Sequence, residues 1–362
     1  MNSCIAFDIG GANIKAASTR RMVCQRPFQL WQAPERLPEQ LADVLSAYPN
    51  PDRIGVTMTG ELADCFESKQ SGVRRIVEAS LQAFGHSTRF YQTSGRFVES
   101  SQAIAQWKQT AASNWHALAA WVAQQTENGF LIDIGSTTVD LIPFQHGQPC
   151  PRGNTDLARL KHHELVYTGV GRSPVSCVIG SVSIDTTSEI PLAQEVFATM
   201  QDVYLLAGRL DPDPTNCSTA DGRPLTISCS RQRIARLLCA DPQELPAGEI
   251  EAITQSARAA QQQLVISKLQ KLVAEHPTIP LHFVVSGQGE WLARTAIQQG
   301  LPTVGQIQSI RELVGKHDPI PLDACPDGEH GLQLSGRGSL EILSQCAPAY
   351  AVACLLEKQN GL

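Results

Sequence analysis

The feature that most constrains the fold of this 362-residue chain is a phrase that occurs twice. Near the start, apolar residues lead into Asp8-Ile9-Gly10-Gly11, and at mid-chain they lead into Asp133-Ile134-Gly135-Ser136. In both copies small polar residues follow, and a second apolar stretch comes after them. The pattern predicts two β-hairpins, each with a carboxylate beside a glycine turn. Turn N–H groups can bind phosphate and carboxylates can bind hydrated cations, so two facing hairpins would clamp a polyphosphate and its metal ion.

Composition narrows the class of protein. The 42% hydrophobic and 18% charged content is ordinary for a globular enzyme. A net charge of -6 without a Lys/Arg run argues against a nucleic-acid partner. We find neither an apolar stretch of spanning length nor a leader, so we expect a cytoplasmic protein without a membrane partner. The 11 cysteines include no Cys-x-x-Cys pair, which argues against zinc and favours reduced thiols.

Alternating strand and helix signals divide the chain into two α/β lobes, and the length suits two domains. We expect the first lobe over residues 1–128 and the second over 129–346. The second would contain inserted loops over 145–225 and a glycine turn over 286–290. A C-terminal helix within 347–362 could return to the first lobe.

Hydrophobic periodicity predicts the main helices. In chain order, we expect them over residues 35–48, 71–84, 97–126 with a break near 113–114, 191–209, 230–239, 249–275 and 347–358.

The two glycine turns supply a candidate phosphate and metal site. Asp8 and Asp133 are the candidate metal ligands, with Mg²⁺ as the expected ion. Glycine allows close backbone approach to an anion, Lys15 adds positive charge, and the second turn offers three consecutive hydroxyl groups. The alternative is a pair of ordinary glycine hairpins with solvated carboxylates. The predicted phosphate-binding residues are Gly10, Gly11, Asn13, Lys15, Gly135, Ser136, Thr137, Thr138 and Arg172.

A third glycine turn, Gly287-Gln288-Gly289-Glu290, follows a predicted strand and opens a predicted helix. A single Gly-x-Gly is weak evidence for a site. As the third turn of an ordered set, it suits a pocket for a nucleoside or another ring.

This ordered set of turns resembles the actin-like ATPase fold, which sugar kinases, acetate kinases and heat-shock chaperones share. The resemblance implies a two-lobed α/β fold with a central cleft that closes on a nucleotide. One departure is Ala12, because many members of that superfamily carry Thr or Ser there, with the hydroxyl facing a phosphate. Ala12 therefore argues against ordinary kinase activity. An ATP-dependent small-molecule kinase is the alternative function, with ATP expected only if it holds, and a non-catalytic nucleotide-gated protein is a third possibility.

Four further motifs are similar to the signatures of a narrower family, described as hydantoinase/oxoprolinase-like and linked to tetrahydromethanopterin-dependent one-carbon metabolism. The departures are Gln288 and Gly171, where bulkier residues are expected. The archaeal branch of the family includes the methanofuran-pathway synthase. The motifs that carry the resemblance are Thr57–Asp64, Tyr167–Val170, Glu195–Asp202 and Ala220–Arg223.

The resemblance implies a transferase of small-molecule substrates, and a homo-oligomer is possible. It would join a γ-glutamyltyramine-like phenol to an aminomethyl-furan-methyl diphosphate, forming an aryl ether and releasing diphosphate for methanofuran or methylofuran biosynthesis.

A carboxylate would accept the phenol proton in this reaction. Glu61 and Asp64 follow a predicted strand at the expected cleft, although an N-cap role or simple solvation is the alternative. Asp202 shares a face of the predicted 191–209 helix with Glu195, and an acidic stripe of that kind is often only a solvated surface. Asp221 is the remaining candidate base.

Overall fold

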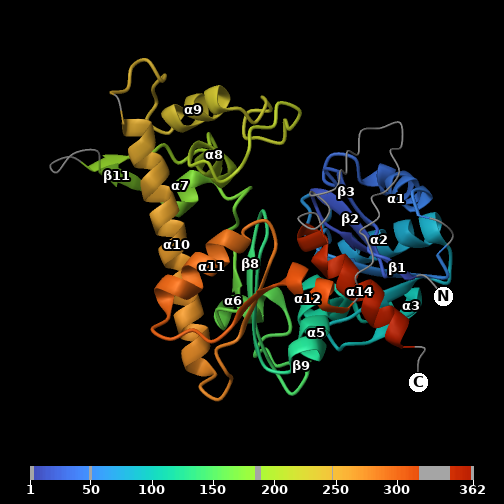
Figure 1. The fold of residues 1–362 in the computed structure, drawn as a ribbon. Helices are drawn as coiled ribbons and strands as arrows, with labels where there is room; N and C mark the ends of the chain where they lie inside the picture. The colour runs from blue at the N-terminus through green and yellow to red at the C-terminus, as the bar shows by residue number, and fades with distance from the viewer. Residues whose placement is uncertain (1–3, 49–50, 184–188, 247, 318–342, 360–362) are drawn as a thin grey trace.

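The computed structural model describes residues 4–48, 51–183, 189–246, 248–317 and 343–359. Two mixed β-sheets, each flanked by helices, form two α/β lobes with a cleft between them (Figure 1). The two-lobed α/β fold expected from the sequence is confirmed by the sheet topology.

The first sheet has the strand order β3-β2-β1-β4-β5-β6. β1 pairs antiparallel with β2 and parallel with β4, and β4 is parallel to β5. Its central strand β1 is buried along its whole length, so it reads as a continuous apolar run broken only by Asp8. The strands are β1 (Cys4–Ile9), β2 (Asn13–Ser18), β3 (Val23–Pro27), β4 (Arg53–Met58), β5 (Arg89–Tyr91) and β6 (Phe97–Val98).

The second sheet repeats this arrangement in the order β10-β8-β7-β13-β14. β7 pairs antiparallel with β8 and parallel with β13, as β1 does with β2 and β4. The repeated phrase in the sequence therefore marks the same hairpin in two related sheets. The strands are β7 (Gly129–Ile134), β8 (Val139–Gln145), β9 (Gln148–Pro149), β10 (Leu165–Val166), β13 (Phe283–Ser286) and β14 (Ile307–Ser309); β11 (Ser181–Ser183) and β12 (Glu189–Pro191) form a separate pair.

Two helices lie where the lobes meet. α5 (Asn114–Thr126) and α14 (Ala347–Lys358) pack against each other, and α14 also runs against β1, β2 and β4 (Figure 1). Gly55 of β4 makes this possible, because a Cβ there would lie 3.0 Å from Val352 and 3.2 Å from Leu356. One apolar cluster contains residues of α5, α14 and both sheets, so it ties the two lobes together below the cleft.

The remaining helices cover the outer faces of the lobes. α10 is the longest of those described, and it packs against α8, α9 and α11 (Figure 1). The bounds are η1 (Pro34–Arg36), α1 (Leu37–Ser46), α2 (Lys69–Phe84), α3 (Ser100–Ala105), α4 (Trp107–Thr110), α6 (Asp156–Lys161), α7 (Val175–Val178), α8 (Met200–Leu206), α9 (Ile227–Arg236), α10 (Glu249–Glu275), α11 (Glu290–Gly300) and α12 (Ile310–His317).

Two predicted helices differ from the structure. The 191–209 helix is wrong over most of its length, because only Met200–Leu206 is helical. Thr199 is extended and forms a capping box with Asp202, which starts the helix late, and Gly208 lies in the left-handed region just beyond its end. The 97–126 region is three short helices rather than two, since the chain also breaks at Gln106.

Candidate active site

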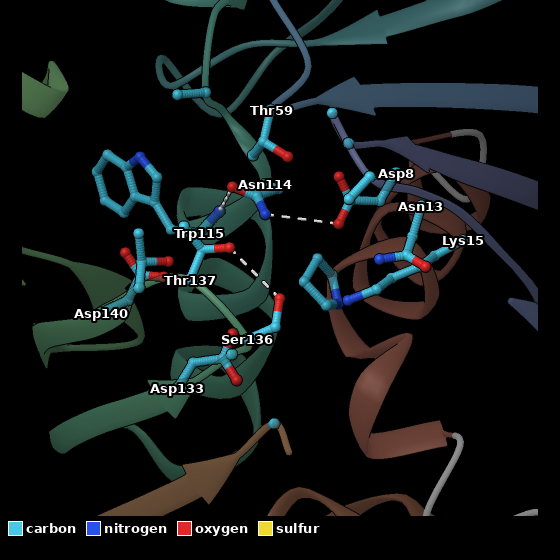
Figure 2. A pocket seen from close by; sticks show the side chains of 18 of the residues that line it. Asp8, Asn13, Lys15, Thr59, Asn114, Trp115, Asp133, Ser136, Thr137 and Asp140 are labelled. Carbon is cyan, nitrogen blue, oxygen red and sulfur yellow. Dashed lines mark hydrogen bonds between the residues drawn. The ribbon is translucent and has the colours of Figure 1, made fainter. Parts of the chain in front are cut away.

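A cavity of about 570 Å³ lies between the two sheets and receives residues from both repeated hairpins. The loop after β4, the start of α5, the loop after β10 and the third glycine turn also contribute to its lining. Figure 2 shows Asp8 and Lys15 on one side of the cavity, with Asp133, Ser136, Thr137 and Asp140 on the other.

The two hairpins are equivalent residue by residue. The N–H of Gly10 donates to the carbonyl of Asn13 at 3.0 Å, and the N–H of Gly135 donates to that of Thr138 at 2.9 Å. Asp8 stands opposite Lys15 in the β1–β2 register, and Asp133 stands opposite Asp140 in the β7–β8 register. The structure thus brings together the predicted metal ligands and the predicted phosphate-binding residues. All the predicted phosphate-binding residues line the cavity. They are Gly10, Gly11, Asn13, Lys15, Gly135, Ser136, Thr137, Thr138 and Arg172.

Asp8 is buried and Asp133 is partly buried, and each has a carboxylate oxygen that is shielded from solvent without a full set of hydrogen-bond partners. Asp8 accepts a hydrogen bond from Asn114 at 3.5 Å, but its Oδ1 has no partner among the described residues, and neither has Oδ1 of Asp133. Burial raises the pKa of Asp8, and burial together with the charge of Asp140 raises the pKa of Asp133 to about 7. Unpartnered buried carboxylate oxygens are what a bound cation would satisfy.

The charges around the cavity do not suit a bare polyanion. Among the described residues, its lining contains three cationic side chains and six carboxylates. The cations are Lys15, Arg159 and Arg172, and the carboxylates are Asp8, Glu61, Asp64, Asp133, Asp140 and Asp156. A phosphate-containing ligand would therefore need an added cation. The described residues contain no cluster of three or more His, Cys, Asp or Glu side chains that could hold a metal. The donor set nevertheless fits Mg²⁺, which is commonly held by one or two carboxylates, with water and phosphate oxygens as its other ligands.

Asp140, which the sequence reasoning missed, belongs to a buried cluster. Arg159 of α6 donates to Asp140 Oδ1 at 2.5 Å and to the carbonyl of Glu164 at 3.0 Å. Its guanidinium lies over the Trp115 ring at 4.0 Å and is only 1% exposed. A signal existed, since Asp140 follows Asp133 by seven residues, as Lys15 follows Asp8. The change of charge at that position hid the correspondence.

Glu61 is the more buried of the two candidate bases that line the cavity, with 1% of its surface exposed. It lines the cavity, its Oε2 has no partner among the described residues, and burial raises its pKa to about 7. The backbone of Glu61 packs directly on Gly72 of α2. Only a glycine allows this contact, because a Cβ on Gly72 would lie 2.2 Å from the Glu61 carbonyl oxygen. Asp64 also lines the cavity, but it is exposed.

The loop from Tyr167 to Arg172 supports the second hairpin turn. The N–H of Val170 donates to the Gly135 carbonyl at 3.1 Å, and the N–H of Arg172 donates to the Ser136 carbonyl at 2.7 Å. Gly169 is required for this approach, because a Cβ there would lie 2.4 Å from the Ser136 carbonyl carbon. The loop delivers Arg172 to the cavity, where its guanidinium lies 5.1 Å from the ring centre of Trp31 in the facing lobe.

Asp202 and Asp221, the other two candidate bases, do not line the cavity. Asp202 is fully buried, accepts hydrogen bonds from the Thr199 N–H and from Ser230, and pairs with Arg233 at 2.7 Å. Asp221 pairs with Arg233 at 3.0 Å and also with Arg223 at 2.6 Å. Arg233 of α9 thus pairs with Asp202 of α8 and with Asp221 of the 211–224 loop. Both carboxylates lie outside the cavity, which corrects the expectation that they belong to the same site as Glu61.

The third glycine turn is split between two environments. Gly287 and Gln288 line the main cavity, and they also line a smaller one of about 270 Å³. Gly289 packs on the second hairpin, where a Cβ would lie 2.4 Å from Ile134 Cγ2. Glu290 lines only the smaller cavity and pairs with Arg294 at 3.0 Å and Arg311 at 2.8 Å. This end of the cleft is therefore strongly charged.

None of the helices in the described part of the chain is both long enough and apolar enough to cross a membrane.

Comparison with solved structures finds relatives of low similarity. Component A of the (R)-2-hydroxyglutaryl-CoA dehydratase of Acidaminococcus fermentans is 13% identical, with full coverage of both chains and a TM-score of 0.43. A chain of the PilM-PilN type IV pilus biogenesis complex is 10% identical, with 97% of each chain covered and a TM-score of 0.47.

Comparison of sequences finds closer relatives. The (4-{4-[2-(gamma-L-glutamylamino)ethyl]phenoxymethyl}furan-2-yl)methanamine synthase of Methanocaldococcus jannaschii is 29% identical over 98% of both chains. The protein of the same name from Methanococcus vannielii is 30% identical over 55% of this chain and 88% of its own. The sequence model of the hydantoinase/oxoprolinase family matches residues 52–304, which include the loop after β4, the second hairpin and the third glycine turn. The chain therefore belongs to the hydantoinase/oxoprolinase family.

Proposed function

We propose that this protein is a transferase of methanofuran or methylofuran biosynthesis, which serves one-carbon metabolism. It joins the phenol oxygen of a tyramine-type acceptor to the exocyclic carbon of an aminomethyl-furan-methyl diphosphate, and diphosphate leaves. The names of the archaeal relatives support this chemistry, because they describe a phenoxymethyl-furan, in which an ether oxygen and a methylene carbon link a phenyl ring to a furan.

The observation that carries the proposal is the set of three carboxylates in one cavity, each with a buried oxygen that has no partner among the described residues. Asp8 and Asp133 come from the equivalent hairpins, and Glu61 comes from the loop after β4. The reaction requires a cation site for the anionic leaving group and a proton acceptor for the phenol. Asp8 and Asp133 could supply the first, and Glu61 could supply the second.

The leaving group would be held by the two hairpin turns. Apart from its chain neighbours, no described residue lies within 4 Å of the position that a Cβ on Gly11 would take, so an anion can approach that backbone closely. Lys15 and Arg172 would neutralise part of its charge. Asp8 and Asp133 would hold Mg²⁺, which when bound supplies further positive charge for the developing diphosphate.

Glu61 would act on the acceptor. As the bond from the furfuryl carbon to the diphosphate oxygen breaks, a bond from the phenol oxygen to that carbon forms, and the phenol proton passes to the Glu61 carboxylate. A pKa of about 7 leaves about half of these groups deprotonated and able to accept a proton at neutral pH, and it makes Glu61 a stronger base than an ordinary glutamate.

The direct test incubates the protein with synthetic aminomethyl-furan-methyl diphosphate, tyramine and MgCl₂. Mass spectrometry should detect the ether, and a coupled assay should detect diphosphate in equal amount. A parallel reaction with ATP and tyramine tests the kinase alternative, which Ala12 makes less favoured because it lacks a hydroxyl beside the phosphate turn. A phosphorylated product with ATP, and no ether in the first reaction, would overturn the proposal.

A further inference from the structure

Few large apolar side chains are strongly exposed in the described residues, and two of them line the active-site cavity. Leu62 is 54% exposed and Tyr167 is 64% exposed. Trp31, which is partly exposed, lines the same cavity. Exposed apolar groups inside a ligand cavity are explained by a ligand that covers them.

Trp31 and Leu62 are held on adjacent loops of the first lobe. Gly60 leaves room for Leu30, since a Cβ at Gly60 would lie 2.9 Å from Leu30 Cδ2. The Cys65 thiol donates to the Leu30 carbonyl at 3.7 Å, so the two loops are joined on both sides of Leu62. The Trp31 indole is also fixed from the second lobe, because Arg172 lies over it.

Tyr167 approaches from the second lobe. It begins the loop that carries Arg172, and the next residue is buried, with Thr168 accepting a hydrogen bond from Gln261 at 2.8 Å. The aromatic side chain therefore rests on an anchored backbone while its ring stays exposed. The three side chains together provide two aromatic rings and one aliphatic face at a cavity that spans the lobes.

The position of Glu61 indicates which ligand this surface takes. Glu61 directly precedes Leu62, and its unpartnered Oε2 belongs to the same cavity. A phenol ring that packs against Trp31, Leu62 and Tyr167 would have its hydroxyl on the side of Glu61, which is the proposed proton acceptor. The opposite end of the cleft suits an uncharged ring poorly, because Glu290 and two arginines gather there.

We propose that Trp31, Leu62 and Tyr167 form the subsite for the aromatic ring of the acceptor, and that this subsite selects a phenol over an aliphatic alcohol. The inference rests on the proposed function and specifies where its second substrate binds. Ring stacking and the filling of an apolar pocket would provide the selectivity.

The test measures binding of tyramine by calorimetry in the presence of Mg²⁺ and inorganic diphosphate. Leu62→Ser and Tyr167→Ala should each weaken binding about tenfold, and Tyr167→Phe should retain it. Leu264→Ser changes a leucine on α10 that is 37% exposed and outside the cavity, so it serves as the matched control and should bind as the wild type does.

Steady-state kinetics separate this inference from the proposed function. The KM for tyramine should rise in Leu62→Ser and Tyr167→Ala, while the KM for the furan-methyl diphosphate stays unchanged. Ether formation with unaltered tyramine binding in both variants would overturn the subsite and leave the function standing. Tyramine binding that depends on these residues, in a protein that makes no ether, would overturn the function and leave the subsite standing.

Discussion

Lys15 and Asp140 occupy the same position in the two hairpins and carry opposite charges. Lys15 stands opposite Asp8 across β1 and β2, and Asp140 stands opposite Asp133 across β7 and β8. Burial raises the pKa of the Asp8 and Asp133 carboxylates; the positive charge of Lys15 opposes this rise in both, and the negative charge of Asp140 adds to it. Because Arg159 pairs with Asp140, Asp133 is the carboxylate of the second hairpin whose Oδ1 has no partner among the described residues.

The first prediction concerns removal of that charge. Asp133→Asn should lower turnover by roughly 10²–10³-fold, as loss of one strong electrostatic contribution does. The same variant should be more stable than the wild type at pH 8 without metal, because the buried charge is gone. Thermal melting at pH 8 with EDTA, combined with the ether assay, checks both outcomes. Asp64→Asn, which changes an exposed carboxylate of the same cavity, is the control.

The pH dependence of stability follows from the same group. The folded-state pKa of Asp133 is about 7, above its ordinary value of 3.8, so between these values the folded state binds more protons than the unfolded state. The stability gained by protonating Asp133 is complete below about pH 4 and is lost as the pH rises through 7. Without metal, the contribution of Asp133 should fall across this window, and Asp133→Asn should remove that part of the slope. An unchanged slope in urea denaturation would contradict the assignment.

Mg²⁺ should reverse this loss. An ion bound by Asp8 and Asp133 stabilises the deprotonated carboxylates, so the rise in Tm on adding Mg²⁺ with diphosphate should be larger at pH 8 than at pH 5. Asp8→Asn should abolish most of the rise. A Tm that responds equally to Mg²⁺ at both pH values, or equally in the variant, would place the ion elsewhere.

Glu61 should control the acidic limb of the rate profile. Because its pKa is about 7 and the base must be deprotonated, kcat/KM for tyramine should increase as the pH rises through 7. Glu61→Gln should lower the rate by about 10²–10⁴-fold and remove this limb. Asp64→Asn should keep the limb. Retention of the limb in Glu61→Gln would exclude Glu61 as the base.

Much of this organisation was predictable from the sequence. The repeated Asp-Ile-Gly phrase predicts both hairpins and the placement of Asp8 and Asp133 beside their turns, because glycine turns and buried strands leave local signals. The Asp140–Arg159–Trp115 cluster was not predictable, since it joins β8, α6 and α5, and no local pattern encodes such packing. Asp202 illustrates the opposite error: its acidic stripe resembled a functional face, but Arg233, 31 residues later, pairs with it in the core.

The last prediction concerns the support of the Tyr167–Arg172 loop. Gln261 of α10 is fully buried; its amide donates to Thr168 at 2.8 Å and to the Gly169 carbonyl at 2.9 Å, and its oxygen accepts from the Tyr204 hydroxyl at 2.5 Å. Gln261→Leu leaves the Gly169 carbonyl and the Tyr204 hydroxyl unsatisfied, so unfolding free energy should fall by about 2–4 kcal/mol.

Tyr204→Phe removes a single hydrogen bond to the Gln261 oxygen, and it should lower the unfolding free energy by about 1–3 kcal/mol, less than Gln261→Leu. Because the loop holds the Ser136 turn and carries Arg172, Gln261→Leu should raise the KM for the furan-methyl diphosphate more than it lowers kcat. Urea denaturation gives the first quantity and initial rates give the second. A stability loss with both kinetic constants unchanged would show that the network supports the fold without positioning the diphosphate site.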